Sequence, residues 1–248
     1  DSVASRGLGD VYKRQVLRAL KYGDAQLIVD LFTERMGCVT FIHRVKKTKH
    51  GRIGVQFFQP LTHLEIEYDA LHNGRLPRLK EVRMVNPYLS IPFDALKLSI
   101  SLFIAEFLYQ CVKGEQASGA LYQYVTTSVH WLDAATAGFA NFHLVFMLHL
   151  TRFIGFYPNL EDDTGHDFFD LRNGVFTPNQ PAHGDFIVPS EASKIRVLMR
   201  MNYDSMHVFK FTRQERNRCV EMILKFYRLH VPSFPELKSL SVLQVLFQ

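Results

Sequence analysis

The period of the hydrophobic pattern changes once along the chain, at the proline-bounded segment from Asn86 to Pro92. Before this segment apolar and polar residues alternate, as in His63 to Tyr68 (HLEIEY) and Leu79 to Val85 (LKEVRMV), which is typical of half-buried strands. After it, apolar residues recur at helical spacing on one predicted face: Phe93, Leu96, Ile100, Phe103, Phe107 and Cys111. The chain is therefore predicted to be α+β, with an all-β first part and an all-α second part.

The first part reads as a small barrel. Ala25 to Thr33 (AQLIVDLFT) and Cys38 to His43 (CVTFIH) are joined by a tight connection and predict a hairpin. With a strand end at Val16 to Leu20 and the two alternating runs, five short strands suit a barrel of the OB type over residues 16–87. Residues 1–15 are small, polar and basic without periodicity, so we expect them to be a leader that is foreign to the domain or disordered.

The second part, residues 93–248, predicts a helical domain with an irregular insertion at 159–189. Helices are expected at Gly119 to Ala134 and, apolar nearly all round, at Asn141 to Ile154. Ser190 is expected to cap a helix through Met201, and Thr212 with Glu215 forms a capping-box pattern for a helix to about His230. Within the insertion, the turn residues 172–174 between Phe-Phe and Val-Phe pairs predict a small hairpin.

Composition limits the class of protein. The net charge is +5, which favours a polyanionic partner. The three cysteines lie far apart and suit neither a disulfide framework nor a thiolate metal site, so we expect a reducing cytoplasm. The apolar run from Leu96 to Val112 carries Lys97 and Glu106, which favours a buried helix over a membrane span.

A basic segment follows the second strand of the predicted hairpin and contains no acidic residue. Its cations are Arg44, Lys46, Lys47, Lys49 and Arg52. They could neutralise several phosphates in a salt-sensitive, sequence-independent way, or they could form a solvated loop without a partner. Stacking platforms for bases could come from Tyr22, Phe41, Phe57 and Phe58, although most aromatic residues of a small barrel belong to its core.

A second basic group lies late in the chain. Lys194, Arg196 and Arg200 are followed by a run that contains Arg213, Arg216, Arg218, Lys225 and Arg228. Since Arg196 and Arg200 stand four apart, they share a helix face. The group could extend a DNA track or receive an acidic peptide, or it could be ordinary helix surface paired with Glu191, Glu215 and Glu221.

Nothing in the sequence predicts an enzyme. There is no nucleophile elbow and no glycine-rich phosphate loop, and His143 and His149 read as core histidines of an apolar helix. No cofactor is expected. Asp163, His166, Asp167 and His183 could supply hard ligands, but structural zinc prefers thiolates at short, regular spacing.

Several phrases, in this order, resemble the RecO family of bacterial recombination mediators. They are Val16-Leu17-Arg18, Tyr22-Gly23-Asp24, Leu27-Ile28-Val29, Gln59-Pro60-Leu61, Phe153 to Pro158, Tyr227 to His230 and Leu237-Lys238-Ser239. The resemblance implies an OB barrel followed by a helical domain, and binding and annealing of single- and double-stranded DNA. It also implies a cytoplasmic, nucleoid-associated protein whose partners are RecR and the acidic, Phe-ended tail of the single-stranded DNA-binding protein, and which helps load RecA.

The chain departs from this family in two places. Many relatives carry a four-cysteine zinc site where this chain has no cysteine, so we expect the hairpin to be held by Phe168, Phe169, Val175 and Phe176. The residues Lys13-Arg14-Gln15 are a poor start for the first barrel strand, which we expect to be short or mispaired.

For the carboxylate of a partner tail, Arg152 at the end of an apolar helix is the candidate cation. The alternative is a helix-terminal arginine that is favoured by the helix dipole.

The predicted function is a non-enzymatic DNA-binding mediator that anneals strands without ATP. The alternative is an interaction scaffold in which the basic segment is incidental.

Overall fold

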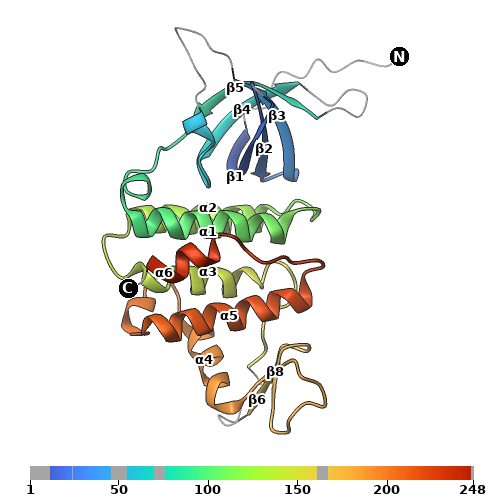
Figure 1. Cartoon of the computed structure of the whole chain (residues 1–248), viewed down its shortest axis with the longest axis vertical. Helices are drawn as coiled ribbons and strands as arrows, with labels where there is room; N and C mark the ends of the chain where they lie inside the picture. Colours follow the sequence, from blue (N-terminus) through green and yellow to red (C-terminus); the bar gives the residue numbers. More distant parts are fainter. Residues whose placement is uncertain (1–11, 24, 46–54, 70–75, 161–166, 247–248) are drawn as a thin grey trace. The chain divides into compact units, whose positions relative to one another are not determined.

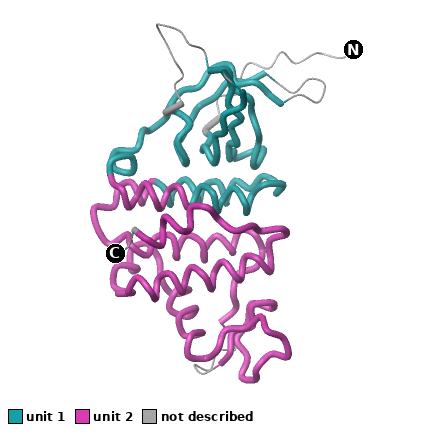
Figure 2. The backbone as a smooth tube through the Cα atoms, viewed as in Figure 1, with its two compact units in different colours: residues 1–93, 104–129 teal, residues 94–103, 130–248 magenta. Residues whose placement is uncertain are grey.

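The computed structural model describes residues 12–23, 25–45, 55–69, 76–160 and 167–246 (Figure 1). The chain forms two compact units, shown in teal and magenta in Figure 2. Unit 1 comprises residues 1–93 and 104–129, and unit 2 comprises residues 94–103 and 130–248. The division passes through helices α1 (Ala95–Val112) and α2 (Gly119–Ala134).

The expected five-stranded barrel is present in unit 1. Its strands are β1 (Tyr12–Tyr22), β2 (Gln26–Thr33), β3 (Gly37–Arg44), β4 (His63–Asp69) and β5 (Arg78–Met84), with a short 3-10 helix, η1 (Val55–Phe58). The strands close in the order β1-β2-β3-β5-β4. The predicted hairpin is β2–β3, and the barrel closes through a parallel bridge between Ile42 and Arg78.

The first strand begins earlier than the sequence predicted. Residues from Tyr12 onward belong to β1, and Tyr12 to Gln15 pair with β4 in a continuous register. The expected short or mispaired strand was therefore wrong, since main-chain pairing with β4 does not depend on apolar side chains at these positions. Residues 1–11 of the expected leader lie outside the described residues.

The barrel core is aliphatic with a few aromatic rings. Val16, Val29, Leu31 and Leu64 are fully buried with Phe41. Within the same unit, Arg18 donates to Asp30 (2.7 Å) and to the hydroxyl of Tyr109 on α1 (2.8 Å). These contacts fix the first barrel strand against the second half of α1.

Unit 2 is mainly helical. Besides its parts of α1 and α2 it contains α3 (Phe142–Leu150), α4 (Pro189–Arg200), α5 (Arg213–His230) and α6 (Leu240–Leu246), with the 3-10 helices η3 (Phe139–Asn141) and η4 (Met206–Val208). As predicted, α3 is buried almost all round. The capping box of Thr212 and Glu215 is confirmed at the start of α5.

Two predicted helix starts were wrong. Phe93 does not join the apolar face of α1: it lies before the helix, in η2 (Ile91–Phe93), and is 86% exposed. Ser190 does not cap α4, because Pro189 already occupies the first turn and Val188 is the N-cap. A proline at that position is preorganised for a helix and needs no hydroxyl cap.

Helix α1 is long and apolar enough to cross a membrane by length and composition alone. More than half of that stretch is buried inside the protein, however, and Ile100, Phe103 and Phe107 are fully covered. Its burial agrees with the expected core helix.

The insertion forms a three-stranded sheet, here called the lobe. It contains β6 (Phe168–Asp170), β7 (Val175–Thr177) and β8 (Phe186–Ile187) in the order β7-β6-β8. The predicted hairpin is β6–β7, and Gly174 takes the positive φ of 67° that its turn requires. The third strand, β8, was not expected.

Candidate nucleic-acid interface

Arg44 is the described member of the predicted basic segment. It lies exposed at the end of β3, while Lys46, Lys47, Lys49 and Arg52 lie outside the described residues. The described structure therefore shows where this segment leaves the barrel, and which side chains stand beside that point.

The strand register places an exposed aromatic ring near Arg44. Tyr22 pairs with Gln26, and Gln26 pairs with Arg44, so Tyr22 and Arg44 are two strands apart, about 10 Å between Cα atoms. Tyr22 is 57% exposed. Of the other expected stacking residues, Phe41 and Phe58 are in the core and Phe57 packs against it.

A further arginine reaches the same end of the barrel from β5. Arg78 is exposed and bridges to Ile42, two residues before Arg44. Ile42 in turn pairs with Ile28, and Ile28 with Leu20, which is 45% exposed. We call Leu20, Tyr22, Arg44 and Arg78 the barrel rim. Sequence reasoning missed Arg78 because the bridge joins residues far apart in the chain.

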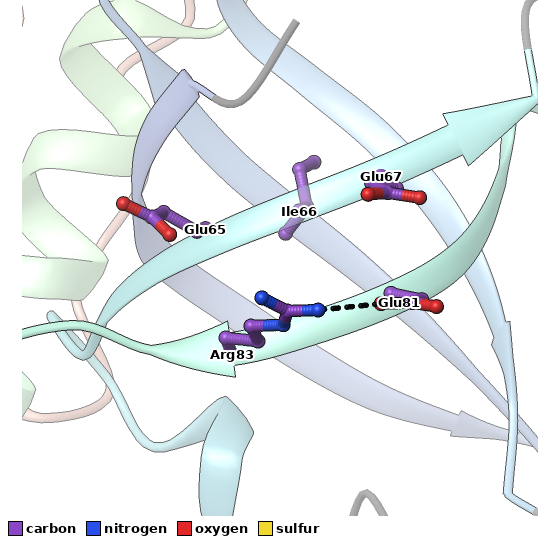
Figure 3. A pocket seen from close by; sticks show the side chains of 5 residues that line it. All are labelled: Glu65, Ile66, Glu67, Glu81 and Arg83. Carbon is purple, nitrogen blue, oxygen red and sulfur yellow. Dashed lines mark hydrogen bonds and ion pairs between the residues drawn. The ribbon is translucent and has the colours of Figure 1, made fainter. Parts of the chain in front are cut away.

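Three carboxylates gather around a hollow on β4 and β5. Glu65, Glu67 and Glu81 line a small hollow of about 50 Å³ together with Ile66 and Arg83 (Figure 3). Arg83 donates to Glu81 at 3.2 Å. Arg83 also lies directly opposite Glu65 in the register, and Lys80 of the same strand pairs with Asp69, so acidic and basic side chains are mixed on this face.

The late basic residues separate into structural and exposed members. Arg216 is buried and donates to Asn141 (3.1 Å) and to the carbonyl of Phe211 (3.0 Å). Arg218 donates two hydrogen bonds, of 2.7 and 2.8 Å, to the carboxylate of Glu191. This pairing raises the pKa of Arg218. These arginines hold unit 2 together.

The candidates on α4 differ from one another. Lys194 is partly buried, and Arg200 is exposed in the last turn. The guanidinium of Arg196 lies over the ring of Phe176, 4.9 Å from its centroid. Arg196 therefore also packs against the lobe, which the four-residue spacing could not predict.

Arg152 follows α3 and is exposed. Its guanidinium lies 4.3 Å from the ring centroid of Tyr157 and donates to the Tyr157 hydroxyl. Tyr157 lines an open groove of about 540 Å³ with Pro158, Asn159, Leu160 and Met199. An apolar slot and a cation thus lie next to each other in unit 2.

Of the two expected core histidines, His143 is buried and His149 is half-buried. Burial, with a smaller contribution from Arg216, lowers the pKa of His143 to about 3. Burial, with Arg152, lowers the pKa of His149 to about 4. Both rings are thus neutral at physiological pH and are unsuited to proton transfer there.

The residues considered for a metal are only partly described. Asp163 and His166 lie outside the described residues, Asp167 is buried, and His183 faces Asp170 at 3.4 Å. Among the described residues, no group of three or more His, Cys, Asp or Glu side chains is placed to hold a metal ion.

Comparison with known proteins matches both parts of the chain. Residues 13–88 match the family described as Recombination protein O N terminal, and residues 92–241 match Recombination protein O C terminal. The DNA repair protein RecO of Bacteroides fragilis is 46% identical over 233 residues, 94% of this chain and 96% of that protein. The protein of the same name from Phocaeicola vulgatus is 44% identical over 232 residues, with the same coverage. That from Flavobacterium psychrophilum is 33% identical over 236 residues, 95% of this chain and 98% of that protein.

Proposed function

Since the chain belongs to the RecO family of bacterial DNA repair proteins, we propose that it is a non-enzymatic mediator that binds and anneals DNA strands. The observation that carries the proposal is the barrel rim. There an exposed ring, Tyr22, and two arginines, Arg44 and Arg78, lie at the end of the barrel where the basic segment leaves β3. Rings that stack on bases beside cations that neutralise phosphates are the usual means of holding single strands.

Phosphate contacts would supply most of the affinity, and Tyr22 would add stacking without reading sequence. Lys46, Lys47, Lys49 and Arg52 are proposed to continue the track from Arg44. On α4, Lys194, Arg196 and Arg200 are proposed as a second contact for single- or double-stranded DNA. Holding two complementary strands on one protein raises their effective concentration, so annealing would need neither ATP nor a cofactor.

The groove beside Arg152 is proposed to receive the tail of the single-stranded DNA-binding protein. Met199, Leu160 and Pro158 offer an apolar slot for a terminal phenylalanine. Arg152, held against Tyr157, would pair with the terminal carboxylate. With RecR, the protein would then load RecA onto coated DNA in the bacterial cytoplasm, on the nucleoid.

The test is a salt titration of oligonucleotide binding by matched variants of one strand. Arg78→Glu and Arg83→Glu make the same change of charge on β5, but only Arg78 lies at the rim. We expect Arg78→Glu to weaken binding by about tenfold and to reduce the salt slope by about 1. Arg83→Glu should stay close to the parent. Charge reversal of Lys46, Lys47, Lys49 and Arg52 together should abolish salt-sensitive binding.

The competing function is a protein scaffold whose basic segment is incidental. It predicts a flat plot of log K against log salt for the parent chain, since no counterions are released. It also predicts that Arg78→Glu and Arg83→Glu behave alike. Either result would refute the proposed DNA-binding rim.

A further inference from the structure

One cross-strand row on the outer face of the barrel is aliphatic. Leu20 of β1 lies opposite Ile28 of β2, and Ile28 lies opposite Ile42 of β3. Directly opposite residues of paired strands share one face of the sheet. The neighbouring residues Leu27 and Phe41 point into the barrel core, so this row points outward. Leu20 is 45% exposed and both isoleucines are half-buried. We call these three residues the aliphatic row.

The row on one side of it is polar and bonded within the protein. Arg18, Asp30 and Thr40 lie opposite one another there. Asp30 accepts hydrogen bonds from Arg18 (2.7 Å) and from the hydroxyl of Thr40 (2.6 Å). The guanidinium of Arg18 lies 4.1 Å from the ring centroid of Tyr109 on α1. The negative charge of Asp30 is therefore balanced by Arg18, and α1 borders the face on this side.

The other side of the aliphatic row is cationic. Tyr22, which is 57% exposed, and Arg44 lie two strands apart in the next row. Arg78 of β5 ends the aliphatic row through its bridge to β3. Asp69 is the acid directly opposite Arg78, and it pairs with Lys80 at 2.5 Å. Arg44 and Arg78 therefore leave this border of the face with an excess of positive charge.

This arrangement suits unpaired bases better than a duplex. The row from Leu20 to Ile42 covers two strand spacings, about 10 Å. The flat faces of unpaired bases are open to apolar contact, whereas a duplex hides them in its stack and offers phosphates and base edges. An apolar row beside a ring and two cations can thus hold the bases and the phosphates of one strand together.

We propose that the aliphatic row is a base platform by which the barrel selects single-stranded over double-stranded DNA. This inference rests on the proposed DNA-binding function and adds Leu20, Ile28 and Ile42 to it. Bases lie across the row, and Arg44 and Arg78 hold the phosphates. The arginines supply a salt-dependent part of the affinity, which a duplex shares. The row supplies a salt-independent part, which requires unpaired bases.

The test measures binding of the full chain by fluorescence anisotropy over a range of salt concentrations. The probes are a labelled oligothymidine, an abasic strand of the same length and a duplex of the same length. We expect the parent chain to bind the abasic strand about tenfold more weakly than oligothymidine. The salt slope should be the same for both strands, since both carry the same phosphates.

Two variants of Leu20 change the platform without touching the cations. Leu20→Ser should weaken oligothymidine binding by about fivefold, with an unchanged salt slope and unchanged binding of the duplex and the abasic strand. Leu89→Ser, the same change at a position that is 82% exposed and outside the barrel strands, should bind like the parent. Leu20→Trp should tighten oligothymidine binding by about threefold, a gain that a damaged barrel would not produce.

Three results would overturn the platform. Oligothymidine and the abasic strand could bind equally with a normal salt slope, which would leave a grip on phosphates alone and the proposed function intact. Leu20→Ser could weaken duplex and single-strand binding alike, which would mean that it acts through the fold. A Glu-Leu repeat peptide could bind the parent and lose binding in Leu20→Ser while oligothymidine binding stays unchanged, which would make a protein segment the occupant. Binding of the parent chain without any salt dependence would instead refute the proposed function itself.

Discussion

The barrel of unit 1 and the lobe of unit 2 are both built from short antiparallel strands, but different interactions hold them. The barrel surrounds aliphatic residues such as Val29, Leu31 and Leu64. The lobe has only three strands and cannot enclose a core. It uses packed aromatic rings instead, with Phe169 tilted against Phe176 (4.9 Å) and edge-on to Phe226 of α5 (6.0 Å between centroids).

The polar contacts follow the same contrast. In the lobe, Asp170 accepts from Asn173 and from the backbone N–H of Arg172, and Arg172 pairs with Asp185 at 2.8 Å. These contacts close the turn and tie it to β8. In the barrel, by contrast, the buried side chain of Gln15 finds no partner for its amide atoms among the described residues. A small sheet thus depends on a few specific contacts, while a closed barrel tolerates a buried polar side chain that lacks a hydrogen-bond partner.

The largest expected effect is the loss of one ring from the lobe. Phe169→Ala removes a buried ring that touches both β7 and α5, and should cost about 3 to 5 kcal/mol of local stability. We expect faster hydrogen exchange throughout β6, β7 and β8. Phe168→Ala, at a partly exposed position of the same strand, should cost clearly less. If both variants leave exchange in the lobe unchanged, the aromatic account of its stability is wrong.

The second effect is a gain in the barrel. Gln15 is 0% exposed and lies beside Phe32 and His63 in the register. Replacing a buried, unsatisfied amide by an apolar side chain of similar size should stabilise the barrel by about 1 to 3 kcal/mol. Gln15→Leu should therefore raise the urea midpoint, whereas Gln26→Leu, on a partly exposed position of β2, should leave it nearly unchanged. A lower midpoint for Gln15→Leu would refute this reading of the first strand.

These contrasts also explain what the sequence could predict. Local patterns identified the β2–β3 hairpin, the Asn173-Gly174 turn and the capping box of α5, because each depends on residues within a few positions of one another. The β6–β7 hairpin of the lobe followed from the same short segments, whereas β8 and the packing of Phe169 on Phe226 of α5 did not. Pairings between distant residues were not accessible in this way.

The candidate site shows the same limit. Arg78 joins the rim through a bridge to Ile42, and Arg216 leaves the expected DNA track because it bonds to Asn141, 75 positions away. Neither partner can be recognised from neighbouring residues. The sequence therefore shows which residues are basic. Only the fold separates the exposed cations from those that hold unit 2 together.

The smallest expected effect is a pH dependence confined to the lobe. Burial acts to raise the pKa of Asp170, but the hydrogen bonds from Asn173 and from the backbone of Arg172 and Asn173 outweigh it, so the pKa is lowered. The stability it contributes is therefore present above the unfolded value, about 4, and is lost as the pH falls through the lower folded value. Hydrogen exchange of β6 and β7, corrected for its intrinsic pH dependence, should report this loss while barrel amides change less. Asp170→Asn should cost about 1 kcal/mol at neutral pH and should flatten the pH response; an unaltered response would mean that another carboxylate carries it.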